Sequence, residues 1–131
     1  MLTSSEFKDY LKTLFPDINI YNGVINQKDY QCIGVFVSGS SNGNNIAIGG
    51  LENTSYSSLP ITLLIHWTEE TNLCQEMANQ VYEALVIMKD TIMSTTRVLY
   101  LNMLDPCPIS INRDSNNICE MIIRLNIIYE R

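Results

Sequence analysis

The sequence predicts a single α/β domain of the α+β kind, in which a mixed, mainly antiparallel sheet is flanked by an N-terminal helix and a central amphipathic helix. The first observation behind this prediction is an apolar strand at 59–67, followed by a polar break and by helical spacing of apolar residues at 71–86. The second is a pair of further apolar strands at 98–104 and 118–129. A chain of 131 residues fits one domain, and we find no internal repeat. We therefore treat 1–131 as one domain.

The first helix has clear boundary signals. Thr3 and Glu6 have the spacing of a capping box, in which each side chain satisfies a free amide of the first turn. Phe7 opens a stripe of apolar residues at helical spacing that runs to Leu14. Pro16 cannot continue the helix, so the helix should end near Leu14.

Strand-like segments and a long loop follow this helix. Residues 18–25 contain Asn22-Gly23 and predict a tight turn or a short strand pair. Residues 32–37 predict a strand, because three β-branched residues alternate along them. Residues 38–58 are rich in Gly, Ser and Asn, which predicts a long flexible loop. Loops of this length within a compact domain are uncommon and are often functional.

The second half of the chain contains the most regular patterns. In the central helix, Leu73, Met77, Val81 and Leu85 recur every fourth residue and should form its buried stripe. In the last strand, apolar side chains at the odd positions from 119 to 129 alternate with more polar ones. This alternation predicts one buried face and one partly solvated face.

The charge balance argues against nucleic-acid and membrane binding. The net charge is −6, and the eight Lys and Arg residues do not cluster, whereas nucleic-acid binders neutralise phosphates with such residues. No segment reaches the roughly 18 apolar residues needed to span a bilayer. The first residues also lack the basic and apolar regions of a signal peptide. We therefore expect a cytoplasmic protein with no specific nucleic-acid binding and no membrane partner.

The residues that most often carry chemistry show no catalytic or metal-binding pattern. The cysteines at 32, 74, 107 and 119 form no CxxC pair; three should be core thiols, and Cys107, between two prolines, should be exposed. His66 has no activating partner at a recognisable spacing, so we expect a structural or surface role. Glu69 and Glu70 favour the positive end of the helix that follows. We therefore expect no enzyme, no catalytic residue, no metal and no cofactor, and a reactive Cys107 would be the first sign to the contrary.

Taken together, these segments resemble the small tail terminator proteins of tailed bacteriophages, a group also called minor capsid proteins. The resemblance covers most of the chain from Phe7 onward. It is carried by the helix ending at Phe15-Pro16, the strand at 30–37, the Gly-rich loop with 49–53, the strand at 59–67, the central helix and the run 105–109 before the last strand.

The resemblance implies a mixed sheet flanked by helices and a protomer that closes into a six-membered ring on the end of a tail tube. Such a ring ends tube polymerisation and presents a surface to the head. The implied partners are other copies of the chain in a homo-hexamer, the tail tube protein and the head–tail connector or neck proteins. In contractile tails and phage-tail-like bacteriocins, the sheath protein is a further implied partner. The implied location is the host bacterial cytoplasm during assembly and then the tail or neck of the virion.

The contacts of such a ring are expected in the loop at 38–58. A closed ring needs heterologous contacts, in which one patch of each subunit meets a different patch of the next. Sheet edges and flexible arms supply such contacts by strand addition. The predicted interface residues in this loop are Ile46, Ile48, Leu51, Glu52 and Tyr56.

Two alternatives stay open on the sequence alone. The protein is another neck or head-completion protein, or it is a soluble ligand-binding α/β domain that uses the 38–58 loop as a lid. A six-subunit ring of 14.9 kDa chains would have a mass of about 89 kDa. A lidded binding domain would remain a monomer or a dimer.

Overall fold

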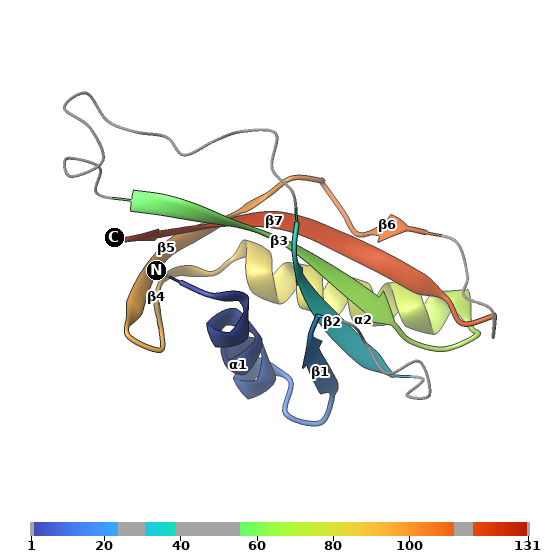
Figure 1. Ribbon diagram of the computed structural model, residues 1–131. Coiled ribbons are helices and arrows are strands. Elements are labelled where there is room, and N and C mark those ends of the chain that lie inside the picture. Colours follow the sequence, from blue (N-terminus) through green and yellow to red (C-terminus); the bar gives the residue numbers. More distant parts are fainter. Residues whose placement is uncertain (1, 24–30, 39–55, 112–116, 131) are drawn as a thin grey trace.

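A curled mixed sheet with both helices on one side forms the framework of the protein (Figure 1). The computed structural model describes residues 2–23, 31–38, 56–111 and 117–130. In chain order its elements are α1 (Ser4–Leu14), β1 (Asn19–Asn22), β2 (Cys32–Val37), β3 (Tyr56–His66), α2 (Thr71–Val86), β4 (Lys89–Met93), β5 (Thr96–Met103), β6 (Ile109–Ser110) and β7 (Glu120–Glu130).

The strands follow the order β1-β2-β3-β7-β5-β4, and the short β6 pairs with β7 outside this path. β1 runs parallel to β2, and every other described pairing is antiparallel. The long strands β3 and β7 form the centre and pair along their whole length. This mixed, mainly antiparallel sheet with two helices confirms the predicted fold class.

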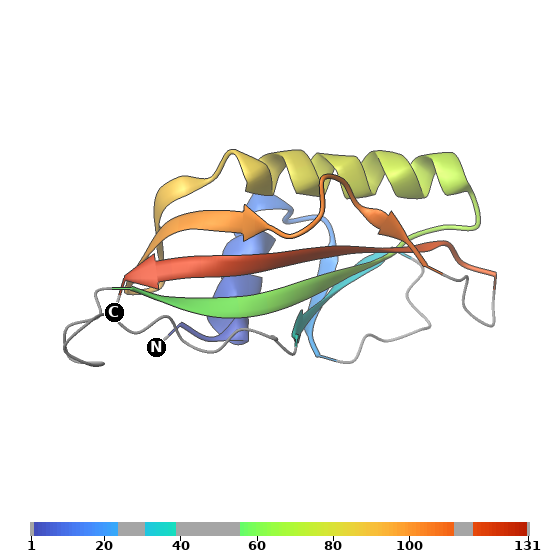
Figure 2. The ribbon, with the colours of Figure 1, turned by 90° about the horizontal axis from the view of Figure 1, so that it is seen from above.

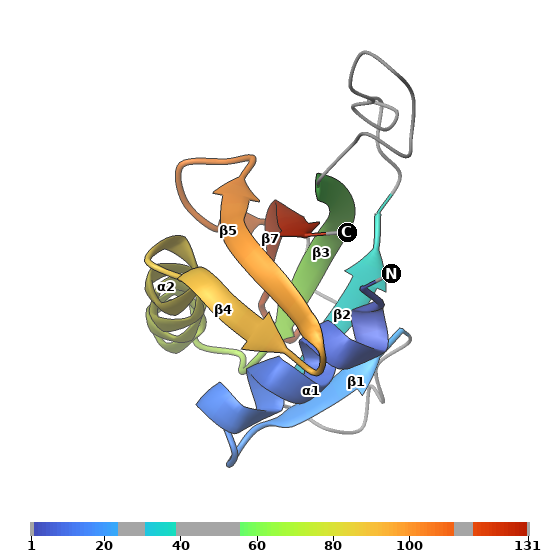
Figure 3. The same cartoon turned by 90° about the vertical axis from the view of Figure 1, so that its left-hand side faces the viewer.

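The hydrophobic core lies between the helices and the concave side of the sheet. α2 contacts β7, β3 and β5, whereas α1 contacts β1, β2 and the edge strand β4. Figure 3 looks along the sheet and shows the curl that brings β1 and β4 toward α1. The predicted alternation in the last strand is confirmed, because every odd position from 119 to 129 is buried.

α1 forms between the boundaries that its sequence predicts. The backbone N–H of Glu6 donates to Thr3 Oγ1 at 3.2 Å, which satisfies one free amide of the first turn. The Glu6 carboxylate accepts from the Thr3 hydroxyl at 3.3 Å, so the second half of the expected capping box uses the side chain of Thr3 instead of its backbone. Phe7 and Leu11 are fully buried and hold the helix against the sheet.

α2 also has its predicted boundaries, but its buried stripe is shorter than expected. Met77, Val81 and Leu85 are buried, whereas Leu73 is 42% exposed. Leu73 lies in the first helical turn, where it lines a surface hollow instead of facing the sheet. The prediction that Leu73 belongs to the buried stripe is therefore wrong.

A strand that the sequence did not predict, β4, forms a hairpin with β5 through the two-residue turn Ser94-Thr95. Ser94 takes a positive φ of 57°, which lets the chain reverse in two residues. A β-bulge between Val98 and Tyr100 interrupts the pairing of β5 with β7. Bulges bend and twist a strand, and this one carries the hairpin toward α1 (Figure 3).

Two predicted segments in the first half of the chain lie partly outside the described residues. In the segment predicted as a tight turn or short strand pair, β1 ends at Asn22 and Gly23 (φ 99°) donates its N–H to the Val35 carbonyl at 2.8 Å, whereas 24–25 are not described. The predicted loop at 38–58 is too long, because β3 already begins at Tyr56. Its pairing with β7 extends to Tyr56↔Glu130, and this long-range register outweighs the polar local sequence.

Candidate interaction surfaces

Of the predicted interface residues, Tyr56 is the one that the structure describes. Ile46, Ile48, Leu51 and Glu52 lie outside the described residues. Tyr56 is the first residue of β3 and is 38% exposed. It therefore belongs to the sheet, where it pairs with the last residue of β7.

A thiol, an imidazole and a carboxylate come together on three adjacent strands, which the sequence did not indicate. The register places Cys32 of β2 and Glu120 of β7 on either side of His66 of β3. Cys32 Sγ lies 3.9 Å from His66 Nδ1. A thiol beside an imidazole that in turn neighbours a carboxylate has the composition of a catalytic triad. However, Cys32 and His66 are both fully buried. A substrate does not reach the sulfur, so the pair is a buried structural contact.

The other thiols are also separated from any cluster of ligating groups. Cys74 and Cys119 are buried, and Cys107 is exposed, as the sequence predicted. The Cys74 thiol donates to the Cys119 carbonyl at 3.4 Å, which ties α2 to the segment before β7. In the part of the chain that the structure describes, no group of three or more His, Cys, Asp or Glu residues is placed to hold a metal ion.

The loop after β5 is fixed by a bidentate ion pair. Arg124 of β7 donates from Nε to Asp105 Oδ2 and from Nη2 to Asp105 Oδ1, both at 2.8 Å. The Tyr82 hydroxyl of α2 donates to the Asp105 carbonyl oxygen at 2.7 Å. The hydrogen bond from Arg124, aided by its positive charge, holds the pKa of the Asp105 carboxyl below its ordinary value. This carboxylate therefore stays ionised and paired, which does not suit a general acid.

A second ion-pair cluster joins the β4–β5 hairpin to the end of β7. Arg97 Nε lies 2.6 Å from Asp90 Oδ1, and Arg97 Nη1 lies 3.1 Å from Glu130 Oε2. The hydrogen bond from Arg97 lowers the pKa of the Asp90 carboxyl. All three side chains are about half exposed or more, so the cluster orients the hairpin more than it stabilises the fold.

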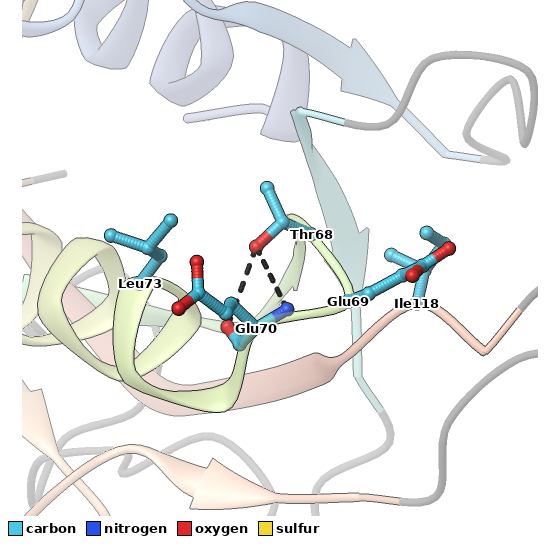
Figure 4. Close-up of a pocket in the computed structure, with 5 residues that line it drawn as sticks. All are labelled: Thr68, Glu69, Glu70, Leu73 and Ile118. Carbon is cyan, nitrogen blue, oxygen red and sulfur yellow. Dashed lines mark hydrogen bonds between the residues drawn. The ribbon is translucent and has the colours of Figure 1, made fainter.

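A hollow of about 440 Å³ opens at the first turn of α2. Its lining, which we call the acidic hollow, consists of Thr68, Glu69, Glu70, Leu73 and Ile118 (Figure 4). Thr68 Oγ1 accepts from the Glu70 N–H and donates to the Glu70 carbonyl, both at 3.3 Å, which fixes the turn into the helix. Figure 4 shows the Glu70 carboxylate beside Leu73 and the Glu69 side chain beside Ile118. The hollow therefore combines apolar side chains with two exposed carboxylates.

Several exposed apolar side chains follow one another along the chain at the end of α2 and in β4. Val86 is 48% exposed, Ile87 is 77% exposed and Ile92 is 59% exposed. Lys89, between them, is also exposed. We call these four residues the α2–β4 surface. Exposed apolar side chains of this size are the kind that protein–protein contacts cover.

One face of the sheet is not covered by a described helix. Figure 2 shows α1 behind the strands and α2 along one side, with neither helix in front of β3 and β7. The register places Phe36, Thr62 and Arg124 in one row across this face. The row contains one aromatic, one polar and one charged side chain, and the charged one, Arg124, is already paired with Asp105. This face therefore offers a broad surface of mixed polarity with no concentrated chemistry.

Comparison with known proteins assigns no family to the chain. Neither a protein-family model nor a curated protein matches it. Among the described residues, no helix is long and apolar enough to cross a lipid bilayer. The case for function therefore rests on the surfaces described above.

The sequence reasoning missed the residues that make the most exposed apolar surface. Ile87, Lys89 and Ile92 lie between the predicted helix and the predicted strand at 98–104. The available signal was the stretch 86–93, where apolar residues continue past the end of the helix and precede the turn-forming pair Ser94-Thr95. Such a stretch predicts a strand but does not show that Ile87 and Ile92 point to solvent.

Proposed function

We propose that this protein is a non-enzymatic structural component of a phage tail, a tail terminator that caps the tail tube as a homo-hexameric ring. In this role it ends tube polymerisation and provides the surface to which the head or neck attaches. The host particle is an infectious phage or a phage-tail-like bacteriocin. The protein assembles in the bacterial cytoplasm and remains in the tail or neck of the finished particle.

The observation that carries this proposal is the difference between the two ends of α2. The α2–β4 surface is apolar and exposed, and the acidic hollow at the other end is concave and negatively charged. A protomer of a closed ring needs two unlike patches, because each subunit presents one patch to the subunit before it and another to the subunit after it.

The fold and the charge also suit this role. The resemblance to tail terminators implies a mixed sheet flanked by helices, and that is the fold of this chain. The net charge of −6 suits a channel through which DNA passes, because like charges keep DNA from adhering to the wall. The proposed partners are the tail tube protein, the connector or neck proteins and, in contractile tails, the sheath protein.

Electron microscopy of particles assembled without this gene tests the proposal. We expect overlong tails of variable length without heads, because nothing then stops the tube from growing. Tails of normal length that fail to join heads would move the protein to the neck or to head completion. Normal particles would overturn the proposal and favour a soluble ligand-binding domain instead.

A further inference from the structure

The two surfaces at the ends of α2 are complementary in shape and in chemistry. At one end Ile87, the most exposed large apolar side chain in the described part of the chain, lies between Val86 and Lys89 in the sequence, and both of these are exposed. At the other end the acidic hollow presents Leu73 and a nearby buried Ile118 together with acidic side chains. A protruding apolar residue with a cation thus has its counterpart in an apolar hollow with carboxylates.

Lys89 is the basic side chain that the described fold leaves without a partner. Lys8 lies 3.7 Å from Asp9, and Lys12 donates to a backbone carbonyl. The remaining described basic residues, Arg97 and Arg124, are held by carboxylates. The ammonium group of Lys89 is therefore available to a carboxylate of another molecule.

Glu70 supplies such a carboxylate. It is exposed at the N-terminal end of α2, and its side chain makes no cap hydrogen bond to the helix. In Figure 4 its carboxylate lies beside Leu73, on the apolar part of the hollow. A cation approaching this point would meet an apolar surface and a negative charge together.

We propose that a second copy of this chain occupies the acidic hollow, with Ile87 inserted against Leu73 and Ile118 and with Lys89 paired to Glu70. The volume of the hollow, about 440 Å³, is ample for one isoleucine side chain. The contact also places the negative end of one α2 dipole near the positive end of the next. It deepens the ring of the proposed function and rests on that proposal for its biological setting.

One chain does not make this contact with itself. α2 has 16 residues, and at about 1.5 Å per residue its ends lie about 24 Å apart. Figure 1 shows α2 running along the sheet with its two ends well apart. Each copy therefore uses its α2–β4 surface on one neighbour and its acidic hollow on the other, and such head-to-tail contacts build rings or filaments.

Two variants that each remove one surface test the contact. Ile87→Asp removes the protruding side chain and adds a negative charge, and Glu70→Lys reverses the charge of the hollow. Sedimentation of the full chain up to about 1 mM should show oligomers for the wild type. Each variant alone should associate at least about tenfold more weakly.

A mixture of the two variants gives the decisive readout. Ile87→Asp keeps an intact hollow and Glu70→Lys keeps an intact α2–β4 surface, so an equimolar mixture should form dimers through this one wild-type contact, which neither variant can make alone. A wild-type chain that stays monomeric at every concentration would overturn the proposed contact. So would a mixture that forms no dimers.

Matched controls separate this contact from general effects of charge and folding. Glu76→Lys makes the same charge change at another exposed position of α2, and Leu104→Asp places an aspartate at an exposed apolar position of the loop after β5. Both should associate like the wild type.

The outcomes separate the contact from the proposed function. If the variants behave as expected but deletion of the gene leaves tails normal, the contact is supported and the tail function is overturned. If deletion gives overlong tails but the variants associate like the wild type, the tail function is supported and this contact is overturned.

Discussion

The middle and the ends of α2 differ in what their residues do for the protein. In the middle, Ala78 and Val81 are fully buried against the sheet, and the buried stripe continues to Leu85. Only two residues after Leu85, Ile87 is 77% exposed, and at the other end Leu73 is 42% exposed. Fold stability explains the buried stripe, but it does not explain large apolar side chains kept in water at both ends. The buried stripe of α2 therefore serves the fold, and the exposed residues at its ends suit contacts with another molecule.

The largest difference should appear when a buried side chain of the α2 stripe and an exposed side chain just after the helix are shortened. Leu85→Ala should lower the free energy of unfolding by about 2–5 kcal/mol, because it leaves a cavity in the core. Ile87→Ala should change it by less than about 0.5 kcal/mol, because the side chain is already in water. Urea unfolding followed by circular dichroism measures both. Equal losses of unfolding free energy in the two variants would show that Ile87 contributes to the fold as Leu85 does.

The N-terminal ends of the two helices offer a second contrast. Thr3 caps α1 through its hydroxyl, whereas Glu70 makes no side-chain cap for α2. Thr3→Ala should therefore cost about 1 kcal/mol of unfolding free energy. Glu70→Ala should cost much less in the same urea titration, and a loss as large as that of Thr3→Ala would show that Glu70 stabilises the fold.

A shorter carboxylate at position 70 should improve the fold slightly. Aspartate is a strongly preferred N-cap residue because its side chain reaches a free amide of the first turn. Glu70→Asp should raise the free energy of unfolding by up to about 1 kcal/mol. It keeps the charge of the acidic hollow, so we expect self-association to persist. A gain in stability would show that this end of α2 is not optimised for the fold.

The smallest effect concerns the ion pair that fixes the loop after β5. The pKa of Asp105 is lowered from 3.8 in the folded protein, mainly by the hydrogen bond from Arg124. A lowered pKa means that the stabilising effect is present above the ordinary carboxyl pKa and is lost as the pH falls through the folded pKa. Asp105→Asn should thus be slightly less stable than the wild type at neutral pH, with the difference shrinking in acid.

Urea unfolding at a series of pH values measures this trend. Glu76→Gln serves as the control, because it removes one carboxylate at another exposed position of the surface. A difference between Asp105→Asn and the wild type that does not change with pH would mean that the ion pair is not the cause.

The elements with strong local patterns were predictable from the sequence. α1 was bounded by Thr3 and Pro16, and α2 by its helical spacing, so both have the predicted ends. The last strand followed from strict alternation. β4 was missed because five residues with one buried side chain give little periodicity. The start of β3 at Tyr56 depends on pairing with β7, which no local pattern contains.

The candidate surfaces were less predictable than the fold. The predicted interface was the loop at 38–58, chosen for its composition, and Ile46, Ile48, Leu51 and Glu52 lie outside the described residues. Ile87 and Leu73 have the same apolar character as core residues, and only the packing of α2 shows that they face solvent. The neighbourhood of Cys32, His66 and Glu120 likewise depends on strand register across the sheet.

The mass of the purified full chain in solution, measured over a range of concentrations, tests the central claim most directly. If unlike ends join copies into a closed hexamer, one species of six times 14.9 kDa, about 89 kDa, should dominate and should not grow as concentration rises. A monomer at all concentrations, a symmetric dimer of about 30 kDa, or a ladder of ever longer oligomers would contradict the closed ring.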